Sequence, residues 1–262
     1  MTYTIAVVNQ KGGVGKTTSS VNLAAGLATQ NFKVLLIDFD PQGHSSEHLS
    51  IKPDPNKTAL EVLNQQQELA SCLYPSYIPN LWVLPSNLRL GQFNQNSPQG
   101  KQFNLKKALA SKEDEYDFVI IDCQPSLSLL TLNALVACNK VLLPVQAEFL
   151  ALDGLSQLIV TLKEIQTKLQ PNLSVLGILL TMYDRRNKLS FEVRAELEKN
   201  FDRDMFATAI PRNVKLAEAP SFGKAIFDYA PSSPGAAAYL DLSKEVVKRL
   251  ELKKPGRRKQ TK

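Results

Sequence analysis

The chain has 262 residues, of which 44% are apolar, and no apolar run reaches the ~18 residues that a membrane-spanning helix needs. Its formal net charge of +6 is carried by residues 253–262, which hold six lysines and arginines and no acid, so that residues 1–252 are formally neutral. With only three cysteines and no expected secretion signal, the composition argues against a disulfide-stapled secreted protein, and we expect a cytoplasmic protein with reduced thiols.

Apolar runs typical of strands alternate with helix-like stretches along the chain. We expect strands at residues 4–9, 33–39, 81–84, 117–121, 141–144, 173–181 and 206–210. We expect helices at residues 16–29, 58–67, 102–110, 127–137, 155–169, 189–200 and 236–252. This alternation predicts an α/β fold with a doubly wound, mostly parallel, twisted sheet and helices on both faces. Residues 1–252 are expected to form one domain, and residues 253–262 a disordered basic tail.

The strongest feature is a glycine-rich segment that follows the first strand and opens the first helix. It reads Lys11-Gly12-Gly13-Val14-Gly15-Lys16-Thr17-Thr18, and a strict P-loop pattern would miss it because Gln10 stands where the first glycine belongs. Glycines let backbone N–H groups turn toward an anion, and a helix N-terminus adds donors. Lys16 is placed to reach the β- and γ-phosphates, and the Thr17 hydroxyl to bind Mg²⁺. The segment therefore predicts a binding site for nucleotide phosphates.

Aspartates close two of the expected strands. Asp38 and Asp40 stand at the end of the second strand, and Asp122 follows residues 117–121. Ligands of a doubly wound sheet bind outside the carboxyl ends of its strands, and an acid there can hold Mg²⁺ through water. Asp122 fits this Walker B role, so Thr17 and Asp122 are the predicted metal residues. Asp38 can equally be a helix cap or a turn residue.

The phosphate loop resembles the deviant Walker A motif of the ParA/MinD group of P-loop ATPases, in which an additional lysine, here Lys11, opens the loop. The resemblance implies Mg²⁺-dependent ATP hydrolysis and an ATP-bound homodimer. Lys11 would reach across to the partner's phosphates, and Gly12 would lie at the tight dimer contact.

The segment Asp38-Phe39-Asp40-Pro41-Gln42-Gly43 resembles the family's DxDPQG segment, which implies that Asp40 orients or activates the attacking water. The expected catalytic residues are thus Lys11, Lys16 and Asp40. The sequence departs from the family pattern at one position. The family usually has two prolines after the Walker B aspartate and the residue that follows it. Gln124 replaces the first of them, which leaves the response of this nucleotide-sensing segment open.

Segments of the second half also resemble ParA-type proteins, among them residues 144–149, 180–184 and 210–224. The similarity extends from residue 4 to about residue 250 and is weakest between 50 and 115. It implies that Pro211 and Asn213 contact the adenine base, with Met182 nearby. An apolar slot with a few fixed polar groups suits a base, although a loop that only directs the chain remains the simpler alternative.

The resemblance also implies partners. Small members of the group bind duplex DNA non-specifically as ATP dimers, and a ParB-like or other adaptor protein stimulates hydrolysis. We therefore expect a nucleoid-associated ATPase that positions a chromosome, a plasmid or another cargo. The basic tail can serve as an additional arm for DNA or only as a solvated end. Candidate DNA-binding cations are Arg185, Arg186, Lys188, Arg194, Lys215, Lys224 and Lys248.

Other functions fit the sequence less well. A MinD-like ATPase would act at a membrane, but residues 253–262 lack bulky apolar anchors, and the apolar positions of the expected helix 236–252 are explained by docking on the core. A cluster-binding relative of the nitrogenase iron protein would need cysteines in a context that is missing here. Specific operator recognition would need a DNA-reading domain before residue 11. His44 and His48 lack further zinc ligands, and both are expected at the surface.

Overall fold

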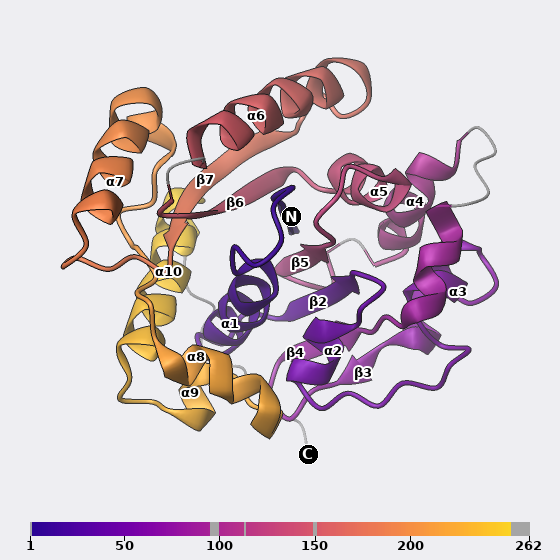
Figure 1. Ribbon diagram of the computed structural model, residues 1–262. Helices are drawn as coiled ribbons and strands as arrows, with labels where there is room; N and C mark the ends of the chain where they lie inside the picture. The colour runs from indigo at the N-terminus through magenta and orange to yellow at the C-terminus, as the bar shows by residue number, and fades with distance from the viewer. Residues whose placement is uncertain (1, 95–99, 113, 149–150, 253–262) are drawn as a thin grey trace.

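The computed structural model describes residues 2–94, 100–112, 114–148 and 151–252, and the predicted basic tail, residues 253–262, lies outside the described residues. One sheet of seven strands has the order β3-β4-β2-β5-β1-β6-β7 (Figure 1). All neighbouring strands are parallel except β3 with β4, which confirms the predicted mostly parallel sheet. The strands are β1 (Tyr3–Val7), β2 (Val34–Phe39), β3 (Tyr74–Pro75), β4 (Leu81–Leu84), β5 (Phe118–Cys123), β6 (Lys140–Gln146) and β7 (Ser174–Thr181).

Helices cover both faces of the sheet (Figure 1). One face packs against α1 (Lys16–Ala28), α2 (His44–His48), α8 (Val214–Glu218), α9 (Ile226–Tyr229) and α10 (Pro234–Arg249). The other face packs against α3 (Ala59–Leu63), α4 (Asn104–Ala110), α5 (Leu129–Ala137), α6 (Ala151–Lys168) and α7 (Lys188–Phe201). Short 3-10 turns are η1 (Leu69–Cys72), η2 (Leu88–Asn94), η3 (Lys101–Phe103), η4 (Asp202–Asp204) and η5 (Ala219–Phe222).

The continuous apolar strands follow from this double cover. Successive side chains of a strand point to opposite faces, so Leu35 and Ile37 of β2 lie in one apolar layer and Val34 and Leu36 in the other. Because β1, β2, β5, β6 and β7 run in the same direction, their carboxyl ends meet at one edge of the sheet. Polar side chains that follow those strands are thereby gathered at that edge.

The predicted strand at residues 206–210 is wrong. Isolated bridges beside β7 flank the segment, at Met205 and Pro211, and the N–H of Phe206 donates to the carbonyl of Ile178 over 2.9 Å. The next two N–H groups, of Ala207 and Thr208, instead donate to the carboxylate of Glu245 on α10, each over 2.9 Å. These side-chain acceptors replace the ladder acceptors that a strand would use, so the ladder is interrupted until the N–H of Ile210 donates to the carbonyl of Leu180 over 2.8 Å.

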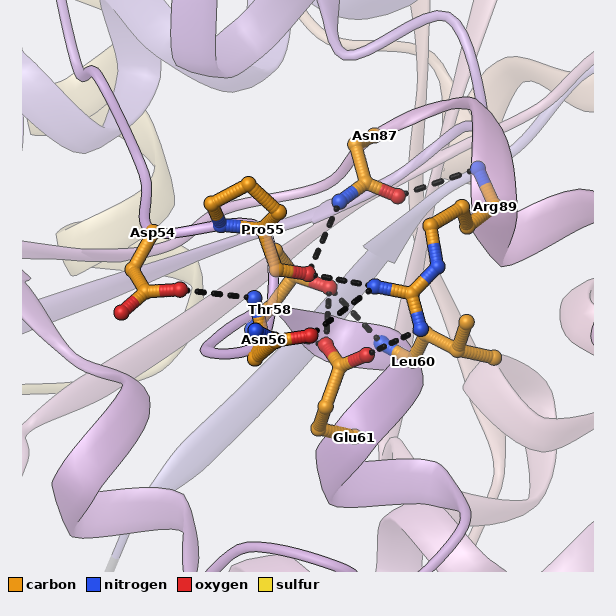
Figure 2. A network of polar contacts seen from close by, with 8 residues as sticks. All are labelled: Asp54, Pro55, Asn56, Thr58, Leu60, Glu61, Asn87 and Arg89. Carbon is orange, nitrogen blue, oxygen red and sulfur yellow. Dashed lines mark hydrogen bonds and ion pairs between the residues drawn. The ribbon is translucent and has the colours of Figure 1, made fainter.

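A polar network fixes the start of α3 (Figure 2). Thr58 and Glu61 form a capping box, in which the Thr58 hydroxyl donates to Glu61 over 2.6 Å. The guanidinium of Arg89 lies 3.1 Å from the other Glu61 oxygen and donates to the carbonyl of Pro55 over 2.7 Å. Since Glu61 is buried, its charge depends on such partners. The helix ends earlier than predicted, because Gln65 takes a left-handed conformation with φ 58°.

Candidate functional site

The glycine-rich segment forms a tight loop between β1 and α1. Gly13 and Gly15 have φ angles of 75° and 85°, a conformation that strains any residue with a Cβ, so both positions favour glycine. The carbonyl of Val14 accepts a 2.9 Å hydrogen bond from the Thr181 hydroxyl, which fastens the loop to the end of β7. The loop leads directly into the first turn of α1, whose leading N–H groups have no acceptor within the helix.

Lys16 lies inside this loop. Its side chain is largely covered, and its Nζ donates to the carbonyl of Lys11 over 2.8 Å. Burial lowers the pKa of the ammonium group, and the nearby carboxylates of Asp122 and Asp40 act in the opposite direction. The Lys16 ammonium therefore donates to a neutral carbonyl oxygen. An anionic phosphate oxygen would form a stronger, charge-assisted hydrogen bond and can take the place of that carbonyl.

Two buried aspartates lie behind the loop. Asp38 on β2 and Asp122 on β5 are register partners of neighbouring parallel strands. Asp122 accepts from the hydroxyls of Ser20 at 2.9 Å and Ser45 at 2.6 Å, and Asp38 accepts from the hydroxyl of Ser46 at 2.6 Å. Burial, reinforced by the Asp122 charge, raises the pKa of Asp38 to about 7. Burial also raises the pKa of Asp122, against the hydrogen bonds that it accepts.

The donor set here fits Mg²⁺. Thr17 lies within hydrogen-bonding reach of Asp122, so a hydroxyl and a carboxylate oxygen face the same space, and hard oxygen donors suit this cation. Among the described residues no group of three or more His, Cys, Asp or Glu side chains could hold a metal ion alone. Such a site therefore suits a cation that keeps several waters and takes further oxygens from phosphates.

A cavity of about 550 Å³ opens above the loop. Eight predicted site residues line it, namely Gly12, Gly13, Gly15, Lys16, Thr17, Thr18, Asp40 and Met182. Residues that the sequence had not assigned to the site also line it, namely Pro41, Gln42, His44, Gln124, Pro125 and Ser126. Asp40 is held in a turn, because its carboxylate accepts from the N–H of Gln42 over 3.0 Å. Val14 is buried behind the loop, and Lys11 is exposed outside the cavity lining.

A second, mainly apolar cavity of about 320 Å³ continues from the first, and both share Gly15, Thr18 and Met182. All three predicted base-contacting residues, Met182, Pro211 and Asn213, line it. Sequence reasoning missed its other walls, because Ile210, Val214, Leu216 and Tyr239 carry only the pattern of core residues. The carboxamide oxygen of Asn213 already accepts from the N–H of Lys215 over 2.9 Å as the N-cap of α8. Its amide N–H groups are therefore the part that can read a ligand.

A wide groove of about 770 Å³ adjoins the apolar cavity, and Pro211 and Arg212 line both. Three of the predicted DNA-binding cations, Arg185, Arg186 and Arg194, line the groove together with Arg212, which the sequence had not singled out. Arg186 lies 3.0 Å from the carboxylate of Asp184, and Arg194 2.7 Å from that of Glu198. Among the described residues, Arg185 and Arg212 have no carboxylate within 4.0 Å.

The other four predicted cations lie outside the groove lining. Lys188 pairs with Glu192 on α7 and Lys215 with Glu218 on α8, while Lys224 and Lys248 are exposed on other elements. The expectation for the histidines is half right, since His44 is exposed but His48 is buried. The His48 ring nitrogen contacts the carbonyl of Lys224 at 3.2 Å, and burial lowers its pKa to about 4. Within the described residues, no helix has the length and apolar character to cross a bilayer.

Comparisons with known proteins found similar sequences and structures. A family model described as an AAA domain matches residues 2–175. The chromosome-partitioning ATPase Soj of Treponema pallidum is 44% identical over 251 residues, which cover 95% of this chain and 98% of that protein. A structure named cobyrinic acid a,c-diamide synthase from Mycobacterium smegmatis, with an ATP analogue and magnesium, is 34% identical with a TM-score of 0.83 over 96% of each chain. The septum site-determining protein MinD of Pyrococcus horikoshii, complexed with Mg-ADP, is 27% identical with a TM-score of 0.77 over 94% of this chain and 96% of its own.

Proposed function

This chain belongs to the AAA-domain family that includes the Soj and ParA partition ATPases, and from that premise we propose that residues 1–252 form a single Mg²⁺-dependent ATPase domain that positions DNA or another large cargo. The ATP-bound form is a homodimer that binds duplex DNA without sequence preference. An adaptor protein of the ParB type, or one that serves another cargo, stimulates hydrolysis. The protein acts in the cytoplasm on nucleoid DNA.

The observation that carries this proposal is the continuity of two cavities of different chemistry. One is lined by glycines, Lys16 and aspartate, as a triphosphate requires, and the other is largely apolar, as a purine requires. They meet at Gly15, Thr18 and Met182, so a single nucleotide can occupy both. Magnesium-nucleotide complexes of two similar structures support this assignment.

The catalytic roles follow from where each side chain lies. Lys16 exchanges the carbonyl of Lys11 for phosphate oxygens, and its charge stabilises the negative charge of the transferred group. Thr17 and Asp122 are the residues that would hold Mg²⁺, the latter through water, and the cation would supply positive charge against the phosphates. Asp40 lines the same cavity from the turn that follows β2 and orients the attacking water.

Lys11 acts in the dimer. Its side chain is exposed beside the loop and outside the cavity lining, which suits a cation that completes the site of a second subunit. Gly12 is also exposed, and a Cβ built on it would meet no atom within 4 Å in this subunit. The open space at Gly12 suits the close approach of a partner subunit.

The groove lined by Arg185, Arg186, Arg194 and Arg212 is the proposed DNA surface. Four guanidinium groups line the groove against the carboxylates of Asp184 and Asp241, and Glu198 pairs with Arg194 beside it, so the groove keeps a basic excess that suits a phosphate backbone. Because Pro211 and Arg212 also line the base cavity, the position of the nucleotide can influence the groove directly. This contact offers a route by which ATP and ADP give different DNA affinities.

Two other functions are less well supported. A membrane-surface role like that of MinD would need an apolar surface, but Tyr239, Val246, Val247 and Leu250 of the C-terminal helix region pack in the core. The Mycobacterium smegmatis protein is named for a different activity, that of a synthase. Its sequence is 34% identical to this chain, whereas the partition ATPase of Treponema pallidum is 44% identical. All three cysteines of this chain are buried, which argues against a thiol nucleophile.

Light scattering coupled to size exclusion tests the proposal. The full chain is run with Mg²⁺ and ATP, with Mg²⁺ and ADP, and without nucleotide, and phosphate release is followed in parallel. We expect a dimer only with ATP in the Asp40→Ala variant, which binds but does not hydrolyse, and a monomer in Lys16→Ala under all conditions. A chain that neither dimerises nor hydrolyses ATP would overturn the proposal.

A further inference from the structure

A cavity of about 290 Å³ lies at the amino ends of the parallel strands, at the opposite end of the strands from the phosphate loop. Thr4 of β1 and Val119 of β5, which are register partners, line it from the sheet. Ala110 and Ala137, the last residues of α4 and α5, and Gln170, which follows α6, also line it. None of the described residues that line it lines the nucleotide cavities or the groove of arginines, so the functions proposed above give it no role.

Three polar side chains in the cavity wall are more than nine-tenths buried. Thr4 is 8% exposed, Tyr116 5% and Gln170 6%. The Thr4 and Tyr116 hydroxyls and the Gln170 carboxamide oxygen have no hydrogen-bond partner among the described residues. Each of the three atoms nonetheless reaches accessible space, because none belongs to the fully buried, unpaired side-chain atoms of that part of the chain. The cavity is the space that all three residues line.

The orientation of the Gln170 amide is fixed by the end of α5. Its nitrogen donates to the carbonyls of Val136 and Cys138 over 2.8 and 3.0 Å, which occupies both N–H groups. The carboxamide oxygen is therefore the group that Gln170 offers to the cavity. A largely buried acceptor is costly without a donor, so this oxygen suits an N–H group of a ligand. The two hydroxyls can donate as well as accept, so they suit a carbonyl oxygen.

Two lysines add positive charge to the cavity. Lys112 is already paired, since its Nζ lies 2.7 Å from the Glu115 carboxylate. Lys106 on α4 lines the cavity without an ion-pair partner among the described residues, so it can bind an anionic group of a ligand. Four apolar residues also line the cavity, namely Leu109, Ala110, Val119 and Ala137. An apolar wall with a few polar groups is typical of a small-molecule site.

We propose that this cavity binds a small carboxylate that carries an acylated N–H group and an apolar side chain. The ligand N–H donates to the Gln170 oxygen, and the acyl carbonyl accepts from the hydroxyls of Thr4 and Tyr116. The carboxylate pairs with Lys106, and the apolar side chain packs against Leu109. An N-acylated amino acid and the C-terminus of a peptide share this chemistry. The site goes beyond the proposed ATPase and stands whether or not the chain binds a nucleotide.

The amide chemical shifts of the isotope-labelled full chain, followed during titration with N-acetyl-L-leucine, test the site. We expect shifts at the residues that line the cavity and a dissociation constant of about 1 mM, as the few heavy atoms of this probe allow. N-acetyl-L-leucine amide lacks the carboxylate, and N-acetyl-N-methyl-L-leucine lacks the N–H group, so each should bind at least about fivefold more weakly. Acetyl-Ala-Ala-Leu distinguishes the two sources, since equal or tighter binding indicates a peptide C-terminus and weaker binding a free small molecule.

Lys106→Met removes the cation and should weaken binding of N-acetyl-L-leucine about fivefold, while the affinity for its uncharged amide stays unchanged. Lys107→Met is the matched control, because Lys107 is exposed on the same helix and lies outside the cavity lining. Tyr116→Phe removes one hydroxyl and should give about a threefold loss of affinity for both probes.

Absence of shifts at the cavity residues with up to about 20 mM N-acetyl-L-leucine would overturn the site. Equal binding of the three single-residue probes, or equal losses in Lys106→Met and Lys107→Met, would also overturn the proposal. The probes are compared on the wild-type chain, so a variant that fails to fold leaves the test intact. ATP binding measured on the same sample reports on the nucleotide site separately, so the failure of one site is distinguished from the failure of the other.

Discussion

The carboxylates of Asp38 and Asp122 stand side by side on neighbouring parallel strands, both fully buried directly behind the phosphate loop. Each is satisfied by serine hydroxyls, Asp122 by Ser20 and Ser45 and Asp38 by Ser46. Two adjacent buried negative charges are costly, so the pair favours keeping one proton until a cation arrives. This relationship makes the stability of the nucleotide-free protein depend on pH.

The first prediction concerns Asp38, whose pKa of about 7 lies above the ordinary value of 3.8. The folded state then holds a proton that the unfolded state releases, so the stabilising contribution is complete below pH 4 and is lost as pH rises toward 7. The size of this effect is on the order of 4 kcal/mol. Asp38→Asn should flatten the fall in unfolding free energy between pH 5 and 7, and should be more stable than wild type at pH 8.

Urea denaturation of nucleotide-free protein at several pH values measures this effect. Asp241→Asn, which changes an exposed carboxylate on α10, is the matched control and should follow the wild-type curve. If Asp38→Asn showed the same pH dependence as wild type, the assignment of the proton to Asp38 would be wrong.

The second prediction separates the two lysines of the loop. Lys16 is buried in the cavity, and its loss removes charge-assisted bonds to phosphate, so Lys16→Ala should weaken ATP binding by roughly a hundredfold. Lys11 is exposed outside the lining, so Lys11→Ala should leave the affinity of the monomer for ATP within about twofold and abolish the ATP-dependent dimer. Titration calorimetry and light scattering give the two readouts, and equal loss of ATP affinity in both variants would contradict these roles.

The third prediction tests the base cavity through Asn213. Aspartate also caps helices well, so Asn213→Asp keeps the N-terminus of α8 while it removes the amide N–H groups of a residue that lines the cavity. We expect the affinity for ATP to fall about tenfold with little change in melting temperature. An unchanged affinity would mean that Asn213 only caps the helix and that the base lies elsewhere.

The fourth prediction compares two neighbouring arginines of the groove. Arg186 is bound to the carboxylate of Asp184 by two nitrogens, at 3.1 and 3.0 Å, whereas Arg185 has no such pair among the described residues. Arg185→Ala should therefore weaken DNA binding in the ATP state more than Arg186→Ala, and should lower the slope of log K against log salt by about 1. Fluorescence anisotropy over a salt series measures both, and an equal or reversed order would contradict the groove as the DNA surface.

The sequence predicted the mostly parallel sheet and the tight glycine-rich loop well because both leave local patterns. Buried parallel strands are continuous apolar runs, and the loop requires glycine at Gly13 and Gly15 for conformational reasons that act within a few residues. Pro211 and Asn213 were expected from resemblance to contact the base; both line the cavity beside the loop, and the contact itself stays a prediction.

The failures have long-range causes. The expected strand at residues 206–210 does not form because Glu245, far along the chain, accepts hydrogen bonds from two of its N–H groups. No local sequence pattern indicates that these N–H groups bind a side chain of a distant helix. His48 is buried because α2 packs against the turn that ends at Lys224, although its polar neighbours suggested the surface. Tyr239 reaches the base cavity from the last helix, and Arg212 joins a groove whose other arginines lie near residue 190, so both placements depend on the assembled fold.

The most direct test of the central claim is binding of the full chain to duplex DNA of unrelated sequence, measured by anisotropy with ATP, with ADP and without nucleotide. Asp40→Ala holds the ATP state, and Lys16→Ala is the control that cannot reach it. We predict salt-sensitive binding to every duplex by wild type and Asp40→Ala with ATP only, and none by Lys16→Ala. Absence of binding by Asp40→Ala with ATP at low salt, or equal binding in all three nucleotide conditions, would contradict an ATP-switched DNA-positioning function.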